Sequence, residues 1–294
     1  MAQGIEQRAE IEEGYVTVNG ARLHYYRAGT GRPLLLLHGL VGSVKNWRQN
    51  IRFLAQHASV CAVDLLNMGE SDRVPGLDSS LEATADRVAE CMDALGLTIA
   101  DIAGHSHGGA VAMMLAVRHP KRVRSLVLFA PANPYCDMGR QLIAFYQTNL
   151  GMWLARQIPW LPRSLKATAL SRMYGNPARI ANDALAGYIE GLHIPGTIDH
   201  ILSIVRGWTA DMRRLRESLG ELAEKPTLLI WGDCDRTVGL ASATKLQRKL
   251  RHSSLLVLSG VGHIPFEEMP DACNGAVRDW LSGEASSNYA VPSN

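Results

Sequence analysis

Residues 101–113 read DIAGHSHGGAVAM and place Ser106 at the centre of a Gly-x-Ser-x-Gly pattern. The pattern follows a short apolar run and precedes a stretch typical of a helix, so it predicts a sharp turn from a strand into a helix. Such a turn strains its central residue and leaves no room for side chains two positions away. We therefore expect Gly104 and Gly108 to provide room, and Ser106 to project beside a helix N-terminus.

Outward from this turn, short apolar runs recur along the whole chain. They are IADIAGHS (99–106), PLLLLHG (33–39), ASVCAVDL (58–65), SLVLFAPA (125–132), PTLLIWGD (226–233) and SSLLVLSG (253–260). Uninterrupted runs of this length suit parallel strands that are buried on both faces, and helical patterns lie between them. Residues 16–26, VTVNGARLHYY, predict an antiparallel hairpin around Asn19-Gly20. The expected fold is a doubly wound, mostly parallel α/β sheet with an N-terminal hairpin.

One long segment breaks the alternation of strands and helices. Residues 133–216 contain helical patterns and no strand-like run, and the segment is too long for a loop. We expect a helical cap, or lid, at 133–216, inserted in a core formed by 14–132 and 217–283, with flexible tails at 1–13 and 284–294. In the cap, Trp153, Trp160 and Tyr174 fit either a small core or the wall of a substrate pocket. Met68 is a further candidate for the pocket wall.

Composition narrows the choice of partners and compartment. The 294 residues include 30 basic and 28 acidic side chains, for a formal charge of +2, which gives no reason to expect nucleic acid. The five scattered cysteines are typical of free thiols in a reducing compartment and show no metal-ligand spacing. The first residues lack the apolar segment of a signal peptide, and no apolar run is long enough to cross a membrane. We expect a cytoplasmic protein without a membrane partner or a metal.

Other candidate site residues also follow strands. The carboxyl ends of parallel strands meet at one edge of a sheet, so groups placed there come together. His38 and Gly39 end one apolar run, and the backbone N–H groups of Leu40 and His107 could form an oxyanion hole. Asp233 and Asp235 follow a later run and His263 follows the last. His105 and His107 adjoin Ser106 in the turn, where an imidazole cannot easily meet the serine hydroxyl in line.

Five short motifs follow one another along the chain: HGLVGS (38–43), DLLNMGESDR (64–73), GHSHGG (104–109), WGDCDRTV (231–238) and GHIPFEEMP (262–270). On these the sequence, from about residue 14 to residue 283, resembles the α/β-hydrolase superfamily. The resemblance is to lidded esterases and to epoxide-hydrolase-like and cofactor-free haloperoxidase-like members. Asn67 departs from the pattern, because relatives often carry glycine there.

The resemblance implies a catalytic triad. Ser106 would be the nucleophile, His263 the general base and Asp235 the orienting acid, with Asp233 as a turn or surface residue; Asp137 is a minor alternative for the acid. His38 would be structural. Epoxide hydrolases and haloalkane dehalogenases of this fold carry aspartate at the nucleophile position, so serine favours acyl transfer.

We expect a carboxylesterase without metal or organic cofactor. Its substrate would be a small or medium, mostly apolar ester, and the protein a monomer or homodimer. Hydrolysis of C–C bonds, lactone opening and cofactor-free haloperoxidase or perhydrolase chemistry remain alternatives on the same triad. A third hypothesis is a ligand receptor that uses the hydrolase pocket for binding, with little turnover.

Overall fold

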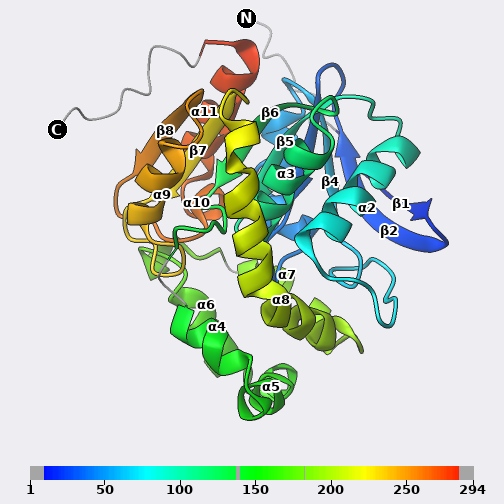
Figure 1. The fold of residues 1–294 in the computed structure, drawn as a ribbon, viewed down its shortest axis with the longest axis vertical. Helices are drawn as coiled ribbons and strands as arrows, with labels where there is room; N and C mark the ends of the chain where they lie inside the picture. The colour runs from blue at the N-terminus through cyan, green and yellow to red at the C-terminus, as the bar shows by residue number, and fades with distance from the viewer. Residues whose placement is uncertain (1–9, 137–139, 182, 285–294) are drawn as a thin grey trace, which may run out of the picture.

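The computed structural model describes residues 10–136, 140–181 and 183–284. Its centre is an eight-stranded sheet with the order β1-β2-β4-β3-β5-β6-β7-β8 (Figure 1). The strands are β1 Glu12–Val18, β2 Ala21–Ala28, β3 Pro33–Leu37, β4 Ser59–Val63, β5 Ala100–His105, β6 Val123–Phe129, β7 Thr227–Gly232 and β8 Ser253–Leu258. The pairings of β2 with β1 and with β4 are antiparallel, and the other pairings are parallel. The mostly parallel sheet predicted from the apolar runs is therefore confirmed.

The N-terminal hairpin is also confirmed. Asn19 and Gly20 both adopt positive φ, of 50° and 83°, and connect β1 to β2. Positive φ at both central residues defines the two-residue turn that matches the twist of a hairpin.

Helices cover both faces of the sheet. The elements outside the segment between β6 and β7 are η1 Val44–Trp47, α1 Ile51–Leu54, α2 Leu81–Ala94, α3 His107–Arg118, α9 Leu240–Gln247, α10 Pro265–Glu268 and α11 Pro270–Ser282. Helix α2 begins at a serine cap: the Ser80 side chain accepts a hydrogen bond from the backbone N–H of Ala83.

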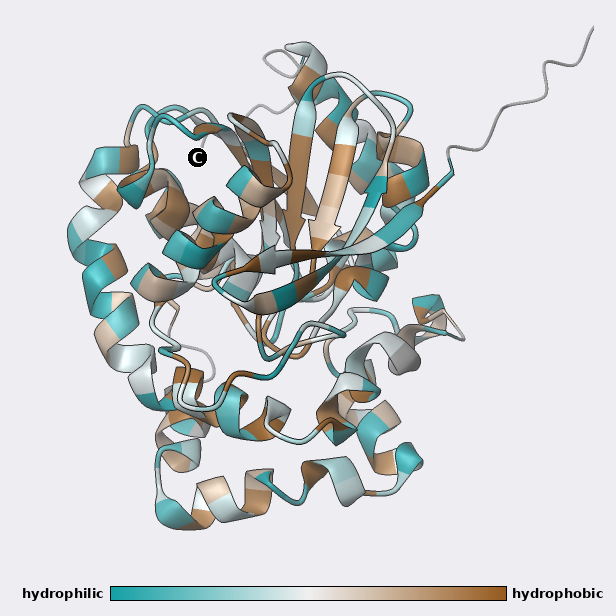
Figure 2. Cartoon of the chain, turned by 90° about the vertical axis from the view of Figure 1, so that its right-hand side faces the viewer, coloured by the Kyte–Doolittle hydropathy of each residue, from teal (hydrophilic) through white to brown (hydrophobic). Residues whose placement is uncertain are grey.

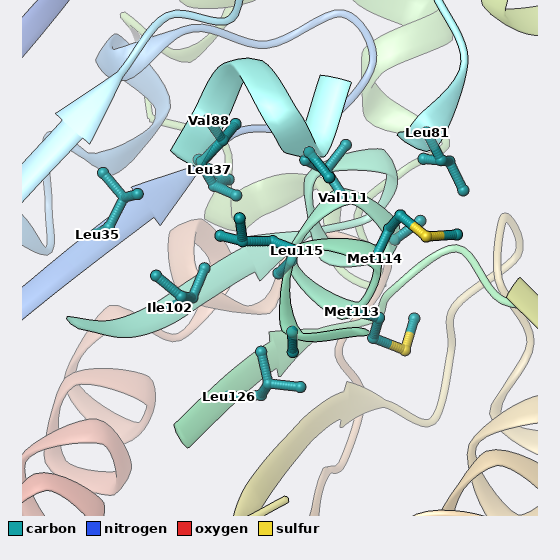
Figure 3. Packing of buried hydrophobic residues seen from close by; sticks show 14 of the residues in the cluster. Leu35, Leu37, Leu81, Val88, Ile102, Val111, Met113, Met114, Leu115 and Leu126 are labelled. Atoms are coloured by element: carbon teal, nitrogen blue, oxygen red, sulfur yellow. The ribbon is translucent and has the colours of Figure 1, made fainter. Parts of the chain in front are cut away.

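Two apolar clusters, one on each face, fix the sheet. On one face, Leu35, Leu37, Ile102 and Leu126 from the strands meet side chains of α2 and α3 (Figure 3). On the other face, η1, α1, α10 and α11 pack around Trp47 and Phe266, whose rings stack at 4.2 Å. Strands buried on both sides explain the uninterrupted apolar runs in the sequence.

In the described residues between β6 and β7, every regular element is a helix, and no strand is present. They are α4 Arg140–Tyr146, α5 Asn149–Ala155, η2 Ile158–Trp160, α6 Arg163–Ser171, η3 Pro177–Arg179, α7 Ala184–Ile189, η4 Gly191–His193, α8 Thr197–Ser218 and η5 Leu219–Leu222. We call the part from α4 to the start of α8 the cap. The expected division into core and cap domains stays a prediction, and most of the two expected tails lies outside the described residues.

The cap lies at one end of the molecule. Its helices project away from the sheet, at the end opposite to the chain termini (Figures 1 and 2). Within the described ranges, none of the helices combines the length and the hydropathy needed to cross a bilayer.

Candidate active site

Ser106 occupies a strained turn between β5 and α3. Its φ is 51° and its ψ is −117°, a conformation that residues with a side chain rarely adopt. A Cβ at Gly104 would collide with the backbone of Gly108, and a Cβ at Gly108 would collide with the carbonyl oxygens of Leu37 and His38. The glycines are thus needed for close backbone approach. Ser106 itself is partly accessible, although its neighbours on both sides are buried.

His263 and Asp235 form a buried pair. The Nδ1 atom of His263 lies 2.8 Å from Oδ2 of Asp235, and both side chains are at most 1% exposed. The other carboxylate oxygen of Asp235 accepts hydrogen bonds from the backbone N–H groups of Thr237, at 2.7 Å, and Val238, at 2.9 Å. Because the carboxylate is fixed from three sides, it orients the imidazole and leaves Nε2 as the nitrogen available for chemistry.

Asp233 has a different role in the structure. Its Oδ1 accepts a hydrogen bond of 2.7 Å from the backbone N–H of Gly260, which ties the two loops after β7 and β8 together. Asp233 is exposed, whereas Asp235 is 5% exposed. The structure therefore brings Asp235 to the histidine and leaves Asp233 at the surface. Asp137, the minor alternative for the acid, lies outside the described residues.

The turn after β3 lies against the nucleophile. A Cβ on Gly39 would lie 3.4 Å from Cβ of Ser106, so this turn runs close to the serine and leaves room for no larger residue than glycine. Within the described part of the chain, the backbone N–H groups of Leu40 and His107 have no acceptor. Two free N–H groups beside a serine are the arrangement that an oxyanion hole requires.

His38 holds this turn in place. Its ring contacts the carbonyl oxygen of Gly39 through Nδ1, at 2.8 Å, and Nε2 accepts a hydrogen bond from the N–H of Leu65, at 3.1 Å. Complete burial lowers the pKa of His38, so the ring is neutral, with its proton on Nδ1. His38 is therefore placed as a structural residue, next to the turn but engaged on both nitrogens.

His105 contacts the loop that carries His263. Its Nε2 lies 2.9 Å from the backbone oxygen of His263, and the two rings lie 4.8 Å apart. Because a carbonyl only accepts, His105 must donate from Nε2. Burial, and secondarily the neighbouring His263, lower its pKa well below the usual range, which keeps the ring neutral. No local pattern predicts this contact, since the partners are 158 residues apart.

The ring of His107 points away from the candidate chemistry. It is 1% exposed, lines a cavity of about 10 Å³ with Met68, Arg87 and His200, and neither ring nitrogen has a partner among the described residues. Burial and the nearby His200 lower the pKa of His107 to about 3. The ring therefore lines a small buried cavity, and the group of His107 that belongs to the candidate oxyanion hole is its backbone N–H.

A larger cavity of about 260 Å³ lies between the core and the cap. Its wall includes Leu40 and Met68 from the core, and Leu192, Ile194 and Ile201 from the cap side. Ser106 and His263 are not part of this wall, so Leu40 is the candidate site residue that connects the cavity to the nucleophile.

An ion cluster borders the same cavity. Nζ of Lys45 lies 2.9 Å from Glu70 and 3.0 Å from Glu190 of the cap, and all three residues line the cavity. The two carboxylates raise the pKa of Lys45, which stays charged. These partly exposed pairs connect the core to the cap at the cavity wall.

Three of the four expected pocket residues do not line either cavity. Trp153 and Trp160 are 58% and 78% exposed, so they face solvent rather than a pocket. Tyr174 is 3% exposed and its hydroxyl donates to Glu267, so it belongs to the packing of cap on core. Of these four residues, Met68 alone lies in the wall of the cavities described above. Helical spacing shows which residues share a face of a helix, but it does not show whether that face points to a pocket.

The backbone conformation of Asn67 explains why asparagine can replace the glycine that relatives often carry at this position. It has a φ of 67°, the left-handed region that glycine adopts without cost. Its side-chain oxygen accepts from the N–H of Val74 at 2.6 Å, and its amide nitrogen lies 3.2 Å from His200. Asparagine tolerates this conformation and here adds contacts that glycine lacks.

Two buried glutamates, which the sequence did not identify, attach the cap to the loop that carries His263. We call this loop, residues 259–264 between β8 and α10, the base loop. Glu267 accepts hydrogen bonds from the hydroxyls of Tyr174, at 3.2 Å, and Tyr188, at 2.6 Å. Arg48 forms an ion pair with it at 2.9 Å. Burial, the largest influence, raises the pKa of Glu267. Both glutamates stand in the quoted stretch GHIPFEEMP, but spacing alone assigns them no partner.

Glu268 and His263 contact the cap backbone directly. Glu268 accepts from the N–H groups of Gly175, at 2.9 Å, and Asn176, at 2.8 Å, and also from Gly262 of the base loop, at 2.8 Å. The N–H of His263 donates to the carbonyl oxygen of Met173 at 2.6 Å. The position of the candidate base is therefore determined partly by cap residues 173–176.

Comparison with known proteins places this geometry in a family. A family model described as alpha/beta hydrolase fold matches residues 32–270. The 2-hydroxymuconate semialdehyde hydrolase of Pseudomonas sp. (strain CF600) is 27% identical over 252 residues, which cover 83% of this chain and 84% of the relative. Epoxide hydrolase 4 of Homo sapiens is 27% identical over 286 residues, 90% of this chain and 77% of the relative.

Solved structures share the fold. Cfl2 from Burkholderia cenocepacia superposes with a TM-score of 0.83 at 22% identity, covering 94% of this chain and 97% of that one. The meta-cleavage product hydrolase CumD from Pseudomonas fluorescens gives 0.77 at 24% identity, with 92% and 97% covered. At this level of identity the likeness concerns the fold.

Proposed function

This chain belongs to the α/β-hydrolase family, and from that premise we propose that it is a serine hydrolase that cleaves carboxylic esters. The family and the named relatives support a hydrolase. The observation that carries the finer proposal is the 2.8 Å contact between His263 and Asp235, at the same edge of the sheet as a serine with a φ of 51°. A serine in such a turn is equipped for nucleophilic attack on a carbonyl carbon when an oriented imidazole can take its proton.

In the proposed first step, the Ser106 hydroxyl oxygen attacks the ester carbonyl carbon while Nε2 of His263 takes its proton. Asp235 accepts a hydrogen bond from Nδ1–H and stabilises the imidazolium. The N–H groups of Leu40 and His107 stabilise the oxyanion, at roughly 3 kcal/mol for each donor. His263 then protonates the leaving alkoxide, and an acyl group remains on Ser106.

In the second step a water molecule replaces the alcohol. His263 removes a proton from the water as it attacks the acyl carbon, and then returns the proton to the Ser106 oxygen as the carboxylic acid leaves. The histidine thus serves as base and acid in turn, which requires a fixed ring with Nε2 free.

The cavity supports a small or medium, mostly apolar substrate. Its volume of about 260 Å³ lies just below the range that is usual for binding sites of small molecules, and leucine, isoleucine and methionine contribute to its wall. We propose that one arm of the ester enters this cavity past Leu40 while its carbonyl group lies at Ser106.

Hydrolysis of C–C bonds is the second candidate function. It is favoured by the relative that is named 2-hydroxymuconate semialdehyde hydrolase, which matches most of both chains. Epoxide opening is disfavoured despite the relative named Epoxide hydrolase 4, because members of that class carry aspartate at the position of Ser106.

A fluorophosphonate probe tests the nucleophile, and a substrate panel tests the reaction. We expect a single adduct on Ser106 by mass spectrometry, absent in Ser106→Ala, together with multiple turnover of short-chain chromogenic esters. A higher kcat/KM for a vinylogous diketone than for any ester would transfer the proposal to C–C hydrolysis, and preference for a lactone would do the same for lactone opening. Ester turnover that survives Ser106→Ala would overturn the serine mechanism.

A further inference from the structure

The outer part of the cap exposes an unusual number of large apolar side chains. Seven of them come from residues 145–165, which form the end of α4, then α5, η2 and the start of α6. They are Phe145, Leu150, Trp153, Leu154, Trp160, Leu161 and Leu165, with exposed fractions from 39% to 78%. We call this set the cap tip.

Helix α5 shows that this exposure is organised. Leu150, Trp153 and Leu154 share one face of the helix and are 61%, 58% and 41% exposed. The opposite side, with Gly151 and Ala155, is buried. An amphipathic helix of a globular protein normally turns its apolar face inward. Here the apolar face points outward, and exposed apolar surface of this kind marks an interaction site.

The charge of the same segment has one sign. Residues 140–182 contain six of the 30 basic side chains of the protein and none of its 28 acidic ones. Arg156 is paired with Asp199 and Arg179 with Glu268. Arg163 and Arg172 are exposed and, within the described residues, have no ion-pair partner. Since the whole chain carries only +2, this local excess is a property of residues 140–182.

The cap tip is placed where a large flat surface can reach it. Helix α5 lies at the extreme end of the molecule, beyond α4 and α6 and away from the chain termini (Figure 1). Hydrophobic residues are visible on the helices at this end in the perpendicular view (Figure 2).

We propose that the cap tip docks on an anionic lipid surface. Tryptophan and leucine side chains would enter the boundary between headgroups and acyl chains, and arginine and lysine side chains would contact the lipid phosphates. The expectation of no membrane partner rested on the lack of a spanning segment, and surface docking needs none. The proposal does not depend on the esterase mechanism, because it concerns binding alone.

A second copy of the chain fits the cap tip less well. In a two-fold symmetric contact the same patch meets itself, so the basic side chains of both copies would be brought together without acidic partners. An anionic surface complements this charge, whereas another cap repels it.

Vesicle cosedimentation with the full chain tests the proposal. We expect binding to vesicles of phosphatidylcholine mixed with phosphatidylglycerol, weaker binding to phosphatidylcholine alone, and loss of binding in high salt. Emission from the exposed tryptophans should shift to shorter wavelength on binding. Trp153→Ser with Trp160→Ser, and separately Arg163→Glu, should each lower the partition coefficient by roughly tenfold or more.

Matched variants far from the cap serve as controls. Ile99→Ser removes an apolar side chain that is 42% exposed, and Lys121→Glu makes the same change of charge as Arg163→Glu. Both should bind vesicles like the parent protein, and all variants should keep the parent's circular dichroism and its activity on a water-soluble ester.

Three results would overturn the proposal. The first is no binding to the anionic vesicles, and the second is equal losses in the cap and control variants. The third is a dimer in sedimentation velocity that the tryptophan substitutions dissociate, which would assign the cap tip to a second copy.

Discussion

His105 donates a hydrogen bond from its ring to the backbone carbonyl of His263, over a distance of 2.9 Å. The residue beside the candidate nucleophile thus holds the candidate base, although it cannot act as the base itself. The contact joins the turn that carries the candidate nucleophile to the loop that carries the candidate base, and burial lowers the pKa of His105, which favours the neutral ring in this contact.

His105→Phe should separate positioning from chemistry. Phenylalanine keeps an aromatic ring but lacks the donor, so the carbonyl of His263 stays buried and unpaired. This should lower the free energy of unfolding by about 1 to 3 kcal/mol. A misplaced base should lower kcat by roughly tenfold to a hundredfold with little change in KM. Steady-state kinetics and thermal denaturation check this, with exposed His252→Phe as the control. An unchanged kcat would remove His105 from the positioning of the base.

The two aspartates after β7 should rank in a definite order. Asp235→Asn removes the charge that faces Nδ1 of His263 and should lower kcat by about 10⁴-fold, by analogy with other triads. Asp233→Asn alters only an exposed contact with the N–H of Gly260 and should change kcat by less than about threefold. Activity measured on the same ester for both variants decides the ranking, and the reverse order would transfer the acid role to Asp233.

Gly108→Ala should disrupt the turn that carries Ser106. The added methyl group meets the carbonyl oxygens of Leu37 and His38, which are backbone atoms and cannot rotate away. We expect a loss of about 3 kcal/mol in the free energy of unfolding together with lost activity. Gly275→Ala, in α11 with nothing within 4 Å of the new Cβ, is the matched control. It should stabilise the protein by about 0.5 to 1 kcal/mol in urea denaturation. Equal effects of the two substitutions would contradict the steric explanation.

Glu267→Gln should loosen the cap from the core. The carboxylate is 2% exposed and accepts from two tyrosine hydroxyls and Arg48. The neutral amide therefore removes the buried charge that faces Arg48, whose guanidinium keeps its ion pair with Asp183. We expect a loss of about 3 kcal/mol in the free energy of unfolding and faster proteolysis within the cap. Glu221→Gln, at an exposed position, should change neither quantity. A Glu267→Gln protein as stable as the parent would show that this carboxylate does not anchor the cap.

Asp211→Asn should stabilise the protein in a pH-dependent way. Burial raises the pKa of Asp211 to about 6 in the folded state, from an ordinary value of 3.8. Ionisation therefore costs folding free energy above about pH 6, and the cost vanishes below about pH 4, where both states are protonated. Asparagine avoids this cost. The difference of about two pKa units corresponds to about 3 kcal/mol, so the variant should gain up to about that amount at pH 8 and little at pH 3.5. Denaturant titrations at the two pH values measure this, and a gain of the same size at both would refute the explanation.

The fold was accessible from the sequence because its signals are local. Uninterrupted apolar runs predicted the parallel strands, and Asn19-Gly20 predicted the hairpin. At the candidate site, strand ends predicted that Ser106, Asp235 and His263 share one edge of the sheet, and the structure places all three there. The assignment of Asp235 over Asp233 needed the family resemblance, since both follow β7 within three residues.

The remaining contacts depend on residues that are distant in sequence. No pattern pairs His105 with a carbonyl 158 residues away, and nothing in GHIPFEEMP shows which cap residues its glutamates accept from. For Trp153 and Trp160, the sequence left a small core and a pocket wall as alternatives, and tertiary packing exposes both side chains to solvent instead. The spacing of apolar residues is visible in the sequence, but the direction in which a helix face points depends on the elements that pack against that helix.

The contacts that Glu268 and His263 make with cap residues 173–176 bear on protein engineering. A cap taken from another hydrolase and grafted onto this core would arrive without its own partner for residues 262–268. The functional module for such a chimera is therefore discontinuous: it comprises the cap together with the seven residues from Gly262 to Glu268. Libraries that recombine caps for new substrate ranges should exchange both pieces at once, or retain residues 173–176 as a fixed joint.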